Sequence, residues 1–259
     1  MNPPSLMYHD VVAPGHEDAS GFPGPAAAHY KLDGEAFERQ LTALAGSGLQ
    51  FPAVTTSPLA TDTSCLLTFD DGGASAAHIG TLLSERRMVG HFMVTTSRIG
   101  TAGFLNADAI RDLDAGGHIV GSHSHTHPAE ISRMPAAMLD AEWRISVERL
   151  QQILGRPVSV ASVPGGFYSR AVAQAAAAAG ICFLFTSEPT VREHIVDGCL
   201  ILGRYTLWRG MEPATTLALA RGTGALRQRQ WLEWNLKKPL KRCARPVYHL
   251  VRRHWLGEA

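Results

Sequence analysis

Two short clusters of polar residues carry the side chains that could do chemistry in this sequence. In the first, Asp70 and Asp71 follow the apolar run of residues 66–69 and precede Gly72. Two adjacent carboxylates repel each other unless a cation or a proton lies between them. Because an Asp-Asp-Gly sequence is also common in ordinary turns, this cluster becomes informative only together with a second one.

Alternating histidines form the second cluster. His123, His125 and His127 follow the apolar residues 119–120. Since His123 and His127 are four residues apart, one turn of helix or a tight turn lets both imidazoles reach the same ion. One carboxylate and two histidines leave coordination positions open for water and substrate, as catalytic divalent sites require. The two clusters together predict a catalytic metal site in which one aspartate binds the ion and the other is free to act.

Strands and helices alternate around these clusters. Apolar runs predict strands over residues 66–69, 91–94, 118–120, 158–161 and 181–185, and helical periodicity or composition predicts helices near residues 37–44, 74–87, 107–115, 136–154 and 171–179. This order is typical of an α/β fold with a mainly parallel sheet, either barrel-like or open. In such folds the working groups follow the strands, as both clusters do. The composition of residues 13–29 favours a loop without regular structure.

Length and composition limit the classes of protein that remain. The chain has 259 residues, of which 45% are hydrophobic and 18% charged, so it can fill the core of one principal domain. No stretch reaches the roughly 18 apolar residues of a membrane-spanning helix, and the first residues lack the pattern of a signal peptide. Four cysteines without a CxxC pair do not form a disulfide framework. We therefore expect a cytoplasmic protein.

Residues 68–72 (TFDDG) and 123–128 (HSHTHP) resemble the first two motifs of the polysaccharide deacetylase family, the NodB-homology group of metal-dependent carbohydrate esterases. The flanking residues 90–94 and 117–122 agree with this resemblance, which covers about residues 5–206. It implies a deformed (β/α) barrel formed by residues 1–210 as a single catalytic domain. Residues 211–259 would then be a basic, aromatic-rich and helical C-terminal extension.

The resemblance also implies a role for each residue of the two clusters. Asp71, His123 and His127 correspond to the metal ligands, and Asp70 corresponds to the base that deprotonates the attacking water. The cofactor would be one divalent ion, zinc in the first place, with cobalt or nickel as alternatives. The expected enzyme is a carbohydrate deacetylase, a hydrolase of linear amides that acts on an acetylated amino-sugar glycan. His125 lies between the ligands in the sequence and is expected to be a supporting or exposed residue.

The later motifs depart from the family pattern. The third region, residues 162–168 (SVPGGFY), lacks the arginine that would orient the base. Pro164, Gly165 and Gly166 still suit a groove wall with a backbone N–H directed at the oxyanion, although a plain turn between strand and helix is the alternative. The fourth and fifth regions also lack their usual residues. Glu188 and Arg204 lie there, and Arg204 is a candidate for the wall of the site.

The acid of the reaction has a candidate near the N-terminus. Residues 6–11 (LMYHDV) resemble the N-terminal segment of the exopolysaccharide deacetylases that modify poly-N-acetylglucosamine, in which the acid histidine comes first. This implies that His9 donates a proton to the leaving amine, with Asp10 as a residue that could orient it. It also places the protein in exopolysaccharide biosynthesis. A buried histidine at the end of a strand is the alternative interpretation of His9.

Two other functions remain open at this stage. The loss of the later motifs would suit a non-catalytic, metal-containing protein that binds carbohydrate. A hydrolase of O-acetyl or N-formyl groups, acting on a lipid-linked or small glycan, would use the same residues. Asp70 and His9 favour an enzyme over a binding protein, since binding alone requires neither a base nor an acid.

The C-terminal region differs in charge from the rest of the chain. Residues 221–259 carry ten Lys or Arg and two Glu, a net charge of +8, whereas residues 1–220 carry 14 basic and 21 acidic residues, a net charge of −7. Cations interleaved with Trp, Leu and Val are typical of a helix that contacts anionic lipid, and a docked extension with solvated charges is the alternative. Pro239 and Pro246 are expected to break this helix. No nucleic-acid partner is expected, because no recognition motif accompanies the charge.

Overall fold

The computed structural model describes residues 3–54 and 63–243, and these contain a main sheet and a two-stranded one. The main sheet has the strand order β11-β1-β4-β5-β6-β7-β8-β10-β9, and β2 pairs with β3. The strands are β1 Ser5–Tyr8, β2 Val11–Val12, β3 Leu32–Asp33, β4 Leu66–Phe69, β5 Gly90–Val94, β6 Ile119–Ser122, β7 Val160–Ser162, β8 Phe183–Phe185, β9 His194–Val196, β10 Cys199–Leu202 and β11 Tyr205–Thr206.

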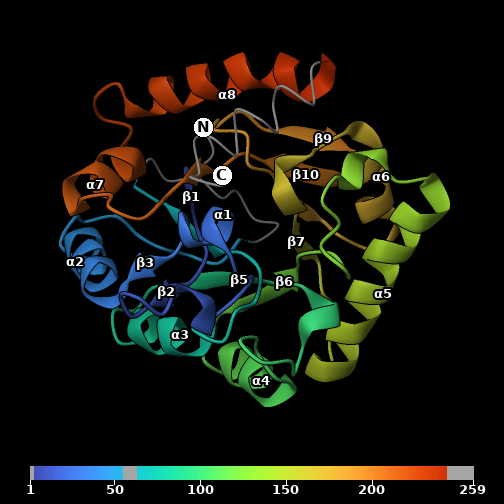
Figure 1. Ribbon diagram of the computed structural model, residues 1–259, viewed down its shortest axis with the longest axis horizontal. Coiled ribbons are helices and arrows are strands. Elements are labelled where there is room, and N and C mark those ends of the chain that lie inside the picture. Colours follow the sequence, from blue (N-terminus) through green and yellow to red (C-terminus); the bar gives the residue numbers. More distant parts are fainter. Residues whose placement is uncertain (1–2, 55–62, 244–259) are drawn as a thin grey trace.

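All pairings in the main sheet are parallel except that of β9 with β10. The helices are α1 Pro25–Ala28, α2 Gly34–Ala45, α3 Ala76–Ser84, α4 Ala107–Ala115, α5 Ala136–Leu154, α6 Arg170–Ala178, α7 Pro213–Arg221 and α8 Leu226–Cys243. Figure 1 shows the sheet curled, with α2 to α7 around its outside and α8 along the top of the view. The expected α/β class with a mainly parallel sheet is confirmed.

Local signals in the sequence set the helix boundaries. Asp33, Asn106 and Ser169 lie at the N-caps of α2, α4 and α6, where each side chain accepts a hydrogen bond from a backbone N–H three residues later. At the other end of α5, Gly155 adopts the left-handed conformation with φ of +68°. The helices therefore begin and end close to their expected positions.

The core between the sheet and the helices has a stack of aromatic rings at its centre. The Tyr8 and Phe92 rings lie on either side of Phe69, with centroids 5.2 and 5.0 Å from it. His91 is buried among these strands, where its Nδ1 lies 2.8 Å from the Leu67 carbonyl oxygen and its Nε2 accepts a hydrogen bond from the Val54 N–H. This packing fixes β1, β4 and β5 side by side, so the residues that follow them share one edge.

The segment of residues 13–29 is more ordered than its composition suggests. It contains a three-residue 3₁₀ turn, Glu17–Ala19, and the short helix α1, so the expectation of no regular structure is wrong. The buried Lys31 ammonium donates hydrogen bonds of 2.6 to 2.7 Å to the carbonyl oxygens of Glu17, Ser20 and Phe22. These three bonds hold the segment closed over the edge of the sheet.

The C-terminal region forms two helices that pack on the body. α7 lies against α2, and its Leu219 and Ala220 are part of the main core. The proposed division at residue 210 stays a prediction. α8 continues through Pro239, so the expected break there is wrong: proline removes one backbone hydrogen bond, and the neighbouring bonds keep the helix continuous. Pro246 lies outside the described residues. Within the described ranges, no helix combines the length and the apolar character needed to cross a membrane.

Candidate active site

The turn after β4 presents two carboxylates at the carboxyl edge of the sheet. Asp70 and Asp71 are both buried, and Asp71 has a φ of +79°, in the left-handed region that non-glycine residues rarely adopt. Its carbonyl oxygen accepts a hydrogen bond from the Thr95 N–H, 3.2 Å away, which ties the turn to the end of β5. Because the side chains of adjacent residues point in different directions in this turn, the two carboxylates contact different partners.

The loop after β6 carries the histidines in a similarly constrained backbone. Ser124 and His127 have φ values of +62° and +57°, so with Asp71 they make up three of the five non-glycine residues with positive φ in the described chain. Such conformations cost on the order of 1–3 kcal/mol each and cluster at functional sites. The surrounding structure must therefore hold this loop firmly.

Helix α5 supplies that support from two positions four residues apart. The Glu142 carboxylate accepts hydrogen bonds from the backbone N–H groups of His125 and Thr126, at 3.0 and 2.8 Å, and from the Thr126 hydroxyl at 2.7 Å. One turn further on, the Ser146 hydroxyl donates to the Ser124 carbonyl oxygen at 3.1 Å. The same face of α5 thus fixes the loop that carries the histidines.

The expected ligand residues converge on one point. Nε2 of His123 and Nε2 of His127 lie 3.4 and 3.5 Å from the same oxygen, Oδ1 of Asp71. One donor atom from each of these residues lies within 4.8 Å of the other two. Two imidazole nitrogens and a carboxylate oxygen suit a divalent transition metal, zinc included. The geometry fits the ion that the sequence predicts, whose identity stays a prediction.

The surroundings of His123 also suit a metal ligand. Its Nδ1 lies 2.6 Å from the Ser162 hydroxyl and 3.1 Å from the Ser162 carbonyl oxygen, at the end of β7. A partner on the second ring nitrogen fixes the orientation of a ligating imidazole and raises its basicity. Ser162 therefore leaves Nε2 of His123 directed at Asp71.

The protonation states of His127 and Asp71 also agree with a role as metal ligands. Burial and the neighbouring His123 lower the pKa of His127 to about 4. Burial raises the pKa of Asp71, but contacts with His123, His9 and His127 outweigh it and lower the value below the usual range. Near pH 7, a neutral imidazole and an ionised carboxylate are the forms that bind a metal.

Asp70 is held by a buried arginine from a distant part of the chain. Nη1 and Nη2 of Arg204 donate to Oδ1 and Oδ2 of Asp70 at 2.7 and 2.8 Å, in a bidentate ion pair with no exposed guanidinium surface. The Ser162 hydroxyl donates a third hydrogen bond to Oδ1 at 3.0 Å. Burial raises the pKa of Asp70, but the Arg204 guanidinium and His123 lower it well below its usual range. Asp70 is therefore an oriented and ionised carboxylate.

Arg204 orients the Asp70 carboxylate, as the arginine missing from the third motif of this sequence would. It follows β10, and its backbone N–H donates to the Glu188 carbonyl oxygen at 2.9 Å while its Nε donates to the Thr186 carbonyl oxygen at 3.1 Å. Nη1 also donates to the Thr68 hydroxyl, two residues before Asp70. Arg204 is thus a partner of the carboxylate rather than only a wall of the site. Glu188 contributes a backbone carbonyl to its position.

His9 lies at the same edge of the sheet as the two clusters. Tyr8 pairs with Phe69 across β1 and β4, which puts the next residues, His9 and Asp70, side by side. A positive charge on His9 lowers the pKa of both Asp70 and Asp71. Among the described residues, Nδ1 of His9 is buried and has no hydrogen-bond partner. The imidazole is therefore near the site, and its role as the acid stays a prediction.

Asp10 does not orient His9. Its Oδ1 accepts hydrogen bonds from the hydroxyls of Ser20 and Ser75, at 2.6 and 2.8 Å. Its carboxylate lies where a Cβ on Gly21 or Gly73 would overlap it. The side chain points into the segment that Lys31 holds closed, so this expectation is corrected: Asp10 fixes the loop beside the site.

The remaining predicted residues, 164–166 and His125, lie in loops beside the ligand cluster. Pro164, Gly165 and Gly166 form a 3₁₀ turn one residue after β7, at the edge that also carries Ser162. Their proposed contact with an oxyanion stays a prediction. Nδ1 of His125 lies 3.0 Å from the Thr96 hydroxyl, so this imidazole contacts the turn after β5.

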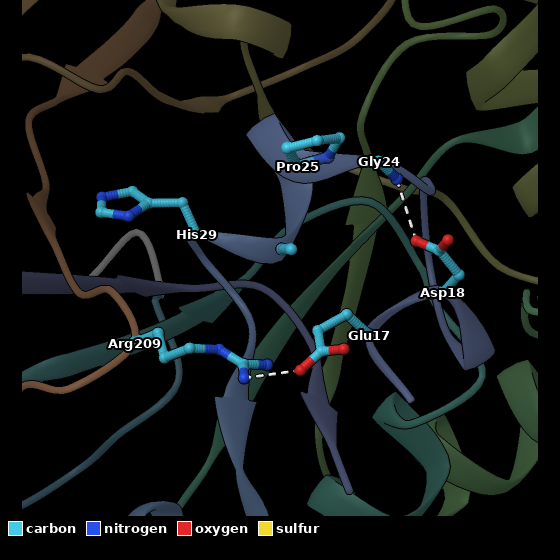
Figure 2. A pocket seen from close by; sticks show the side chains of 7 residues that line it. Glu17, Asp18, Gly24, Pro25, His29 and Arg209 are labelled. Atoms are coloured by element: carbon cyan, nitrogen blue, oxygen red, sulfur yellow. Dashed lines mark hydrogen bonds and ion pairs between the residues drawn. The ribbon is translucent and has the colours of Figure 1, made fainter. Parts of the chain in front are cut away.

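An open cavity of about 540 Å³ lies between residues 17–29 and Arg209. Figure 2 shows the ion pair of Arg209 with Glu17, and Asp18 bonded to the backbone of Gly24. Three contacting rings connect this cavity to the site. His9 stacks on Tyr30 with a centroid separation of 5.1 Å, Tyr30 contacts His29 at 5.0 Å, and His29 lines the cavity. The cavity is thus two rings away from His9.

Comparison with known proteins identifies this arrangement. Residues 60–184 match the family model described as polysaccharide deacetylase. This segment of the chain is a polysaccharide deacetylase domain. The matched segment contains the three ligand-type residues, Asp70 and Ser162, whereas His9 and Arg204 lie outside it. No curated protein sequence gives a significant match.

Solved structures with the same fold include deacetylases. The Streptococcus pyogenes deacetylase PplD in complex with acetate has a TM-score of 0.72 at 20% identity, covering 85% of this chain and 98% of that one. IcaB from Ammonifex degensii has a TM-score of 0.64 at 18% identity, with coverages of 85% and 98%. The BpsB deacetylase domain from Bordetella bronchiseptica has a TM-score of 0.60 at 17% identity, with coverages of 80% and 96%. These likenesses confirm the deformed (β/α) barrel.

Proposed function

We propose that this protein is a metal-dependent deacetylase that removes N-acetyl groups from an amino-sugar glycan. The observation that carries the proposal is the Arg204–Asp70 ion pair beside the cluster of Asp71, His123 and His127. A protein that only binds sugar through a metal needs no second, separately oriented carboxylate. The family match supports the same class of reaction.

The three clustered residues would hold one divalent ion, for which we propose zinc. When bound, such an ion polarises an acyl carbonyl and acidifies water. The chain's own contribution is to fix the donors: Asp71 through its left-handed turn, His123 through Ser162, and His127 through its loop on α5. A preformed ligand set costs no reorganisation when the substrate binds.

Asp70 acts as the base in this proposal. Its carboxylate is adjacent to the ligand cluster, and three hydrogen bonds from Arg204 and Ser162 fix its plane. It can accept a proton from the attacking water because it stays ionised across the working pH range. The low pKa makes it a weak base, which suffices when the water is already acidified.

His9 donates the proton that the leaving amine needs. Expulsion of an amine is poor without protonation, and a positioned acid typically contributes about a hundred- to ten-thousand-fold. The side-by-side placement of His9 and Asp70 supports this role. His9→Ala should keep the metal, lose most turnover on an N-acetyl sugar, and lose less on an activated ester, whose leaving group needs no proton. An equal loss on both substrates would contradict the assignment.

The substrate we propose is an exopolysaccharide of the poly-N-acetylglucosamine type. The support is the resemblance of residues 6–11 to the segment of those deacetylases that carries the acid histidine. The test is acetate release by the metal-loaded protein from a panel of N-acetylated oligosaccharides of increasing length. Release that rises with length supports a polymer, and release from a monosaccharide alone would contradict it.

The same assay separates the alternatives. Parallel substrates carrying O-acetyl or N-formyl groups distinguish the acyl group and the bond that is hydrolysed. A chelator should abolish activity, and the divalent ion should restore it. Binding of every glycan in the panel without release of any acyl group would instead establish a carbohydrate-binding protein and overturn the proposal.

A further inference from the structure

Helix α8 packs on α7 and on the edge strand β11, where polar contacts hold it. Arg227 donates hydrogen bonds to the carbonyl oxygens of Leu219 and Ala220, at 2.7 and 3.0 Å. Gln230 bonds both backbone groups of Thr206, its Nε2 donating at 2.9 Å and its Oε1 accepting at 3.2 Å. These contacts cover the edge strand β11 and fix which face of α8 points toward the body.

The same face reaches the rim of the active site. A Cβ on Gly166 would lie 3.1 Å from the Trp234 ring, so the indole packs directly on the turn that follows β7. Arg227, Gln230 and Trp234 are spaced by three and four residues and therefore share one side of the helix. Arg227, at one end of that side, contacts α7, and Trp234, at the other end, contacts the turn at Gly166 beside the site.

The rest of the α8 surface exposes large apolar side chains, with Leu232 and Leu236 opposite the body-facing side and Trp231 on its flank. Trp231, Leu232 and Leu236 are 47%, 54% and 72% exposed. They are half of the exposed large hydrophobic residues in the described chain, and they lie within six consecutive residues. The other three, on α5 and β9, are Met138, Ile145 and Ile195. Such a concentration within two turns of one helix marks an interaction surface.

The charge of the chain indicates what this surface meets. Ten Lys or Arg against two Glu give residues 221–259 a net charge of +8, whereas the preceding residues carry −7. An anionic surface would therefore attract the C-terminal region and repel the body. Apolar side chains combined with excess cations suit a bilayer containing anionic lipid, because both burial of apolar area and electrostatic attraction contribute.

We propose that α8 lies on an anionic membrane surface, with Trp231, Leu232 and Leu236 inserted at the interface. Since Trp234 of the same helix packs on Gly166, the membrane surface and the active site are then linked through one side chain. The substrate class that fits this placement is a glycan attached to the membrane. That last step rests on the proposed deacetylase function, whereas the membrane contact does not.

The first experiment is co-sedimentation of the full chain with vesicles of phosphatidylcholine, with and without phosphatidylglycerol. We expect salt-sensitive binding to the anionic vesicles only. The double variant Leu232→Ser, Leu236→Ser should bind at least about tenfold more weakly, because two inserted side chains are lost. Its matched control, Met138→Ser with Ile145→Ser, removes exposed apolar surface from α5 and should bind like the wild type.

Several outcomes would overturn the proposal. They are wild-type protein that stays in the supernatant, a Leu232, Leu236 variant that binds as well as the wild type, or an equal loss in the α5 control. Tighter retention by an RNA homopolymer than by anionic vesicles would assign the surface to nucleic acid instead. Tryptophan fluorescence adds a local readout: a blue shift on vesicle binding should be absent in Trp231→Phe, and an unchanged shift there would contradict insertion of Trp231.

A second experiment tests the substrate class separately from the activity. Acetate release is measured on the same glycan, free in solution and attached to lipid in anionic vesicles. The Leu232, Leu236 variant should keep wild-type turnover of the free glycan and lose about tenfold on the vesicle-borne one. Equal turnover of both forms would refute a membrane-attached substrate. Absence of acetate from both forms would refute the deacetylase function, while leaving the vesicle-binding result intact.

Discussion

At the scale of single residues, the chemistry of the site depends on the pair formed by Asp70 and Arg204. The two hydrogen bonds of 2.7 and 2.8 Å fix the carboxylate plane, and the guanidinium charge keeps it ionised in a buried position. Arg204→Lys retains a positive charge but cannot form the planar fork. This substitution therefore separates orientation of the base from its charge.

For Arg204→Lys we expect a fall in kcat of about a hundredfold with KM nearly unchanged, as for loss of an oriented group acting in the transition state. Because Arg204 lowers the pKa of Asp70, a weaker contact raises that pKa. The acid limb of the pH–rate profile should move to higher pH. Arg156→Lys, which alters an exposed ion pair with Asp114, is the control. An unchanged profile for Arg204→Lys would show that Asp70 does not depend on this pair.

Ser162 connects the base to the ligand cluster. Its hydroxyl lies 3.0 Å from Oδ1 of Asp70 and 2.6 Å from Nδ1 of His123. Ser162→Ala should lower metal affinity about ten- to a hundredfold, as is typical for a partner of a ligating histidine. Competition with a chelator measures this directly. Metal affinity equal to that of the wild type would mean that the Ser162 carbonyl alone orients the imidazole.

At the scale of elements, α5 determines whether the histidine loop keeps its shape. Replacing Glu142 with Ala removes three hydrogen bonds to His125 and Thr126 and leaves two backbone N–H groups without their partner. We expect a loss of about 2–4 kcal/mol in the free energy of unfolding, measured by denaturant titration, together with weaker metal binding.

The same helix offers a matched control for Glu142→Ala. Glu148 lies on the solvent side of α5 and pairs only with Arg144, at 3.2 Å, in the described contacts. Glu148→Ala should change the unfolding free energy by less than about 0.5 kcal/mol and leave metal binding intact. Similar losses in both variants would attribute the effect to helix propensity rather than to the loop.

Much of this architecture can be predicted from local sequence, because interactions between residues close in the chain determine the helices and strands. Caps such as Asp33 and runs such as residues 66–69 act within a few residues, so helices and strands lie near their expected positions. Asp71, His123 and His127 are recognisable because the metal site requires their types and spacing. Their convergence also follows from the parallel sheet, which brings strand ends together.

Ser162, Glu142 and the role of Arg204 escaped prediction because tertiary contacts create them. Arg204 meets Asp70 across 134 positions of sequence, and no local pattern encodes that distance. A weak signal existed, since Arg204 follows closely on an apolar strand run, as Asp70 does. Glu142 is the one charged residue on the mainly apolar buried face of α5, between Leu139 and Trp143, and this irregularity could have indicated a buried partner.

At the scale of the whole molecule, a buried histidine couples stability to pH. His91 has no exposed surface, and burial lowers its pKa from 6.5 to about 4. Above pH 6.5 the imidazole is neutral in both the folded and the unfolded chain. Between pH 6.5 and 4 only the unfolded chain takes up the proton, so the free energy of unfolding should fall by up to about 3 kcal/mol.

Urea titrations at a series of pH values test this coupling. The variant His91→Gln removes the titrating group, so the difference in unfolding free energy between wild type and variant should shrink as the pH falls from 6.5 to 4. The difference isolates His91 from the carboxylates of the site, which titrate in both proteins. A difference that stays constant over this range would contradict the expected coupling.

The central claim is that Asp70 is a base and Asp71, His123 and His127 hold the ion. The most direct test is acetate release from an N-acetylated glycan by Asp70→Asn, with bound metal measured in the same sample. We predict about one divalent ion per chain, as in the wild type, and a loss of activity of at least about a hundredfold. Full activity of Asp70→Asn, or loss of its metal, would contradict this division of roles between the two aspartates.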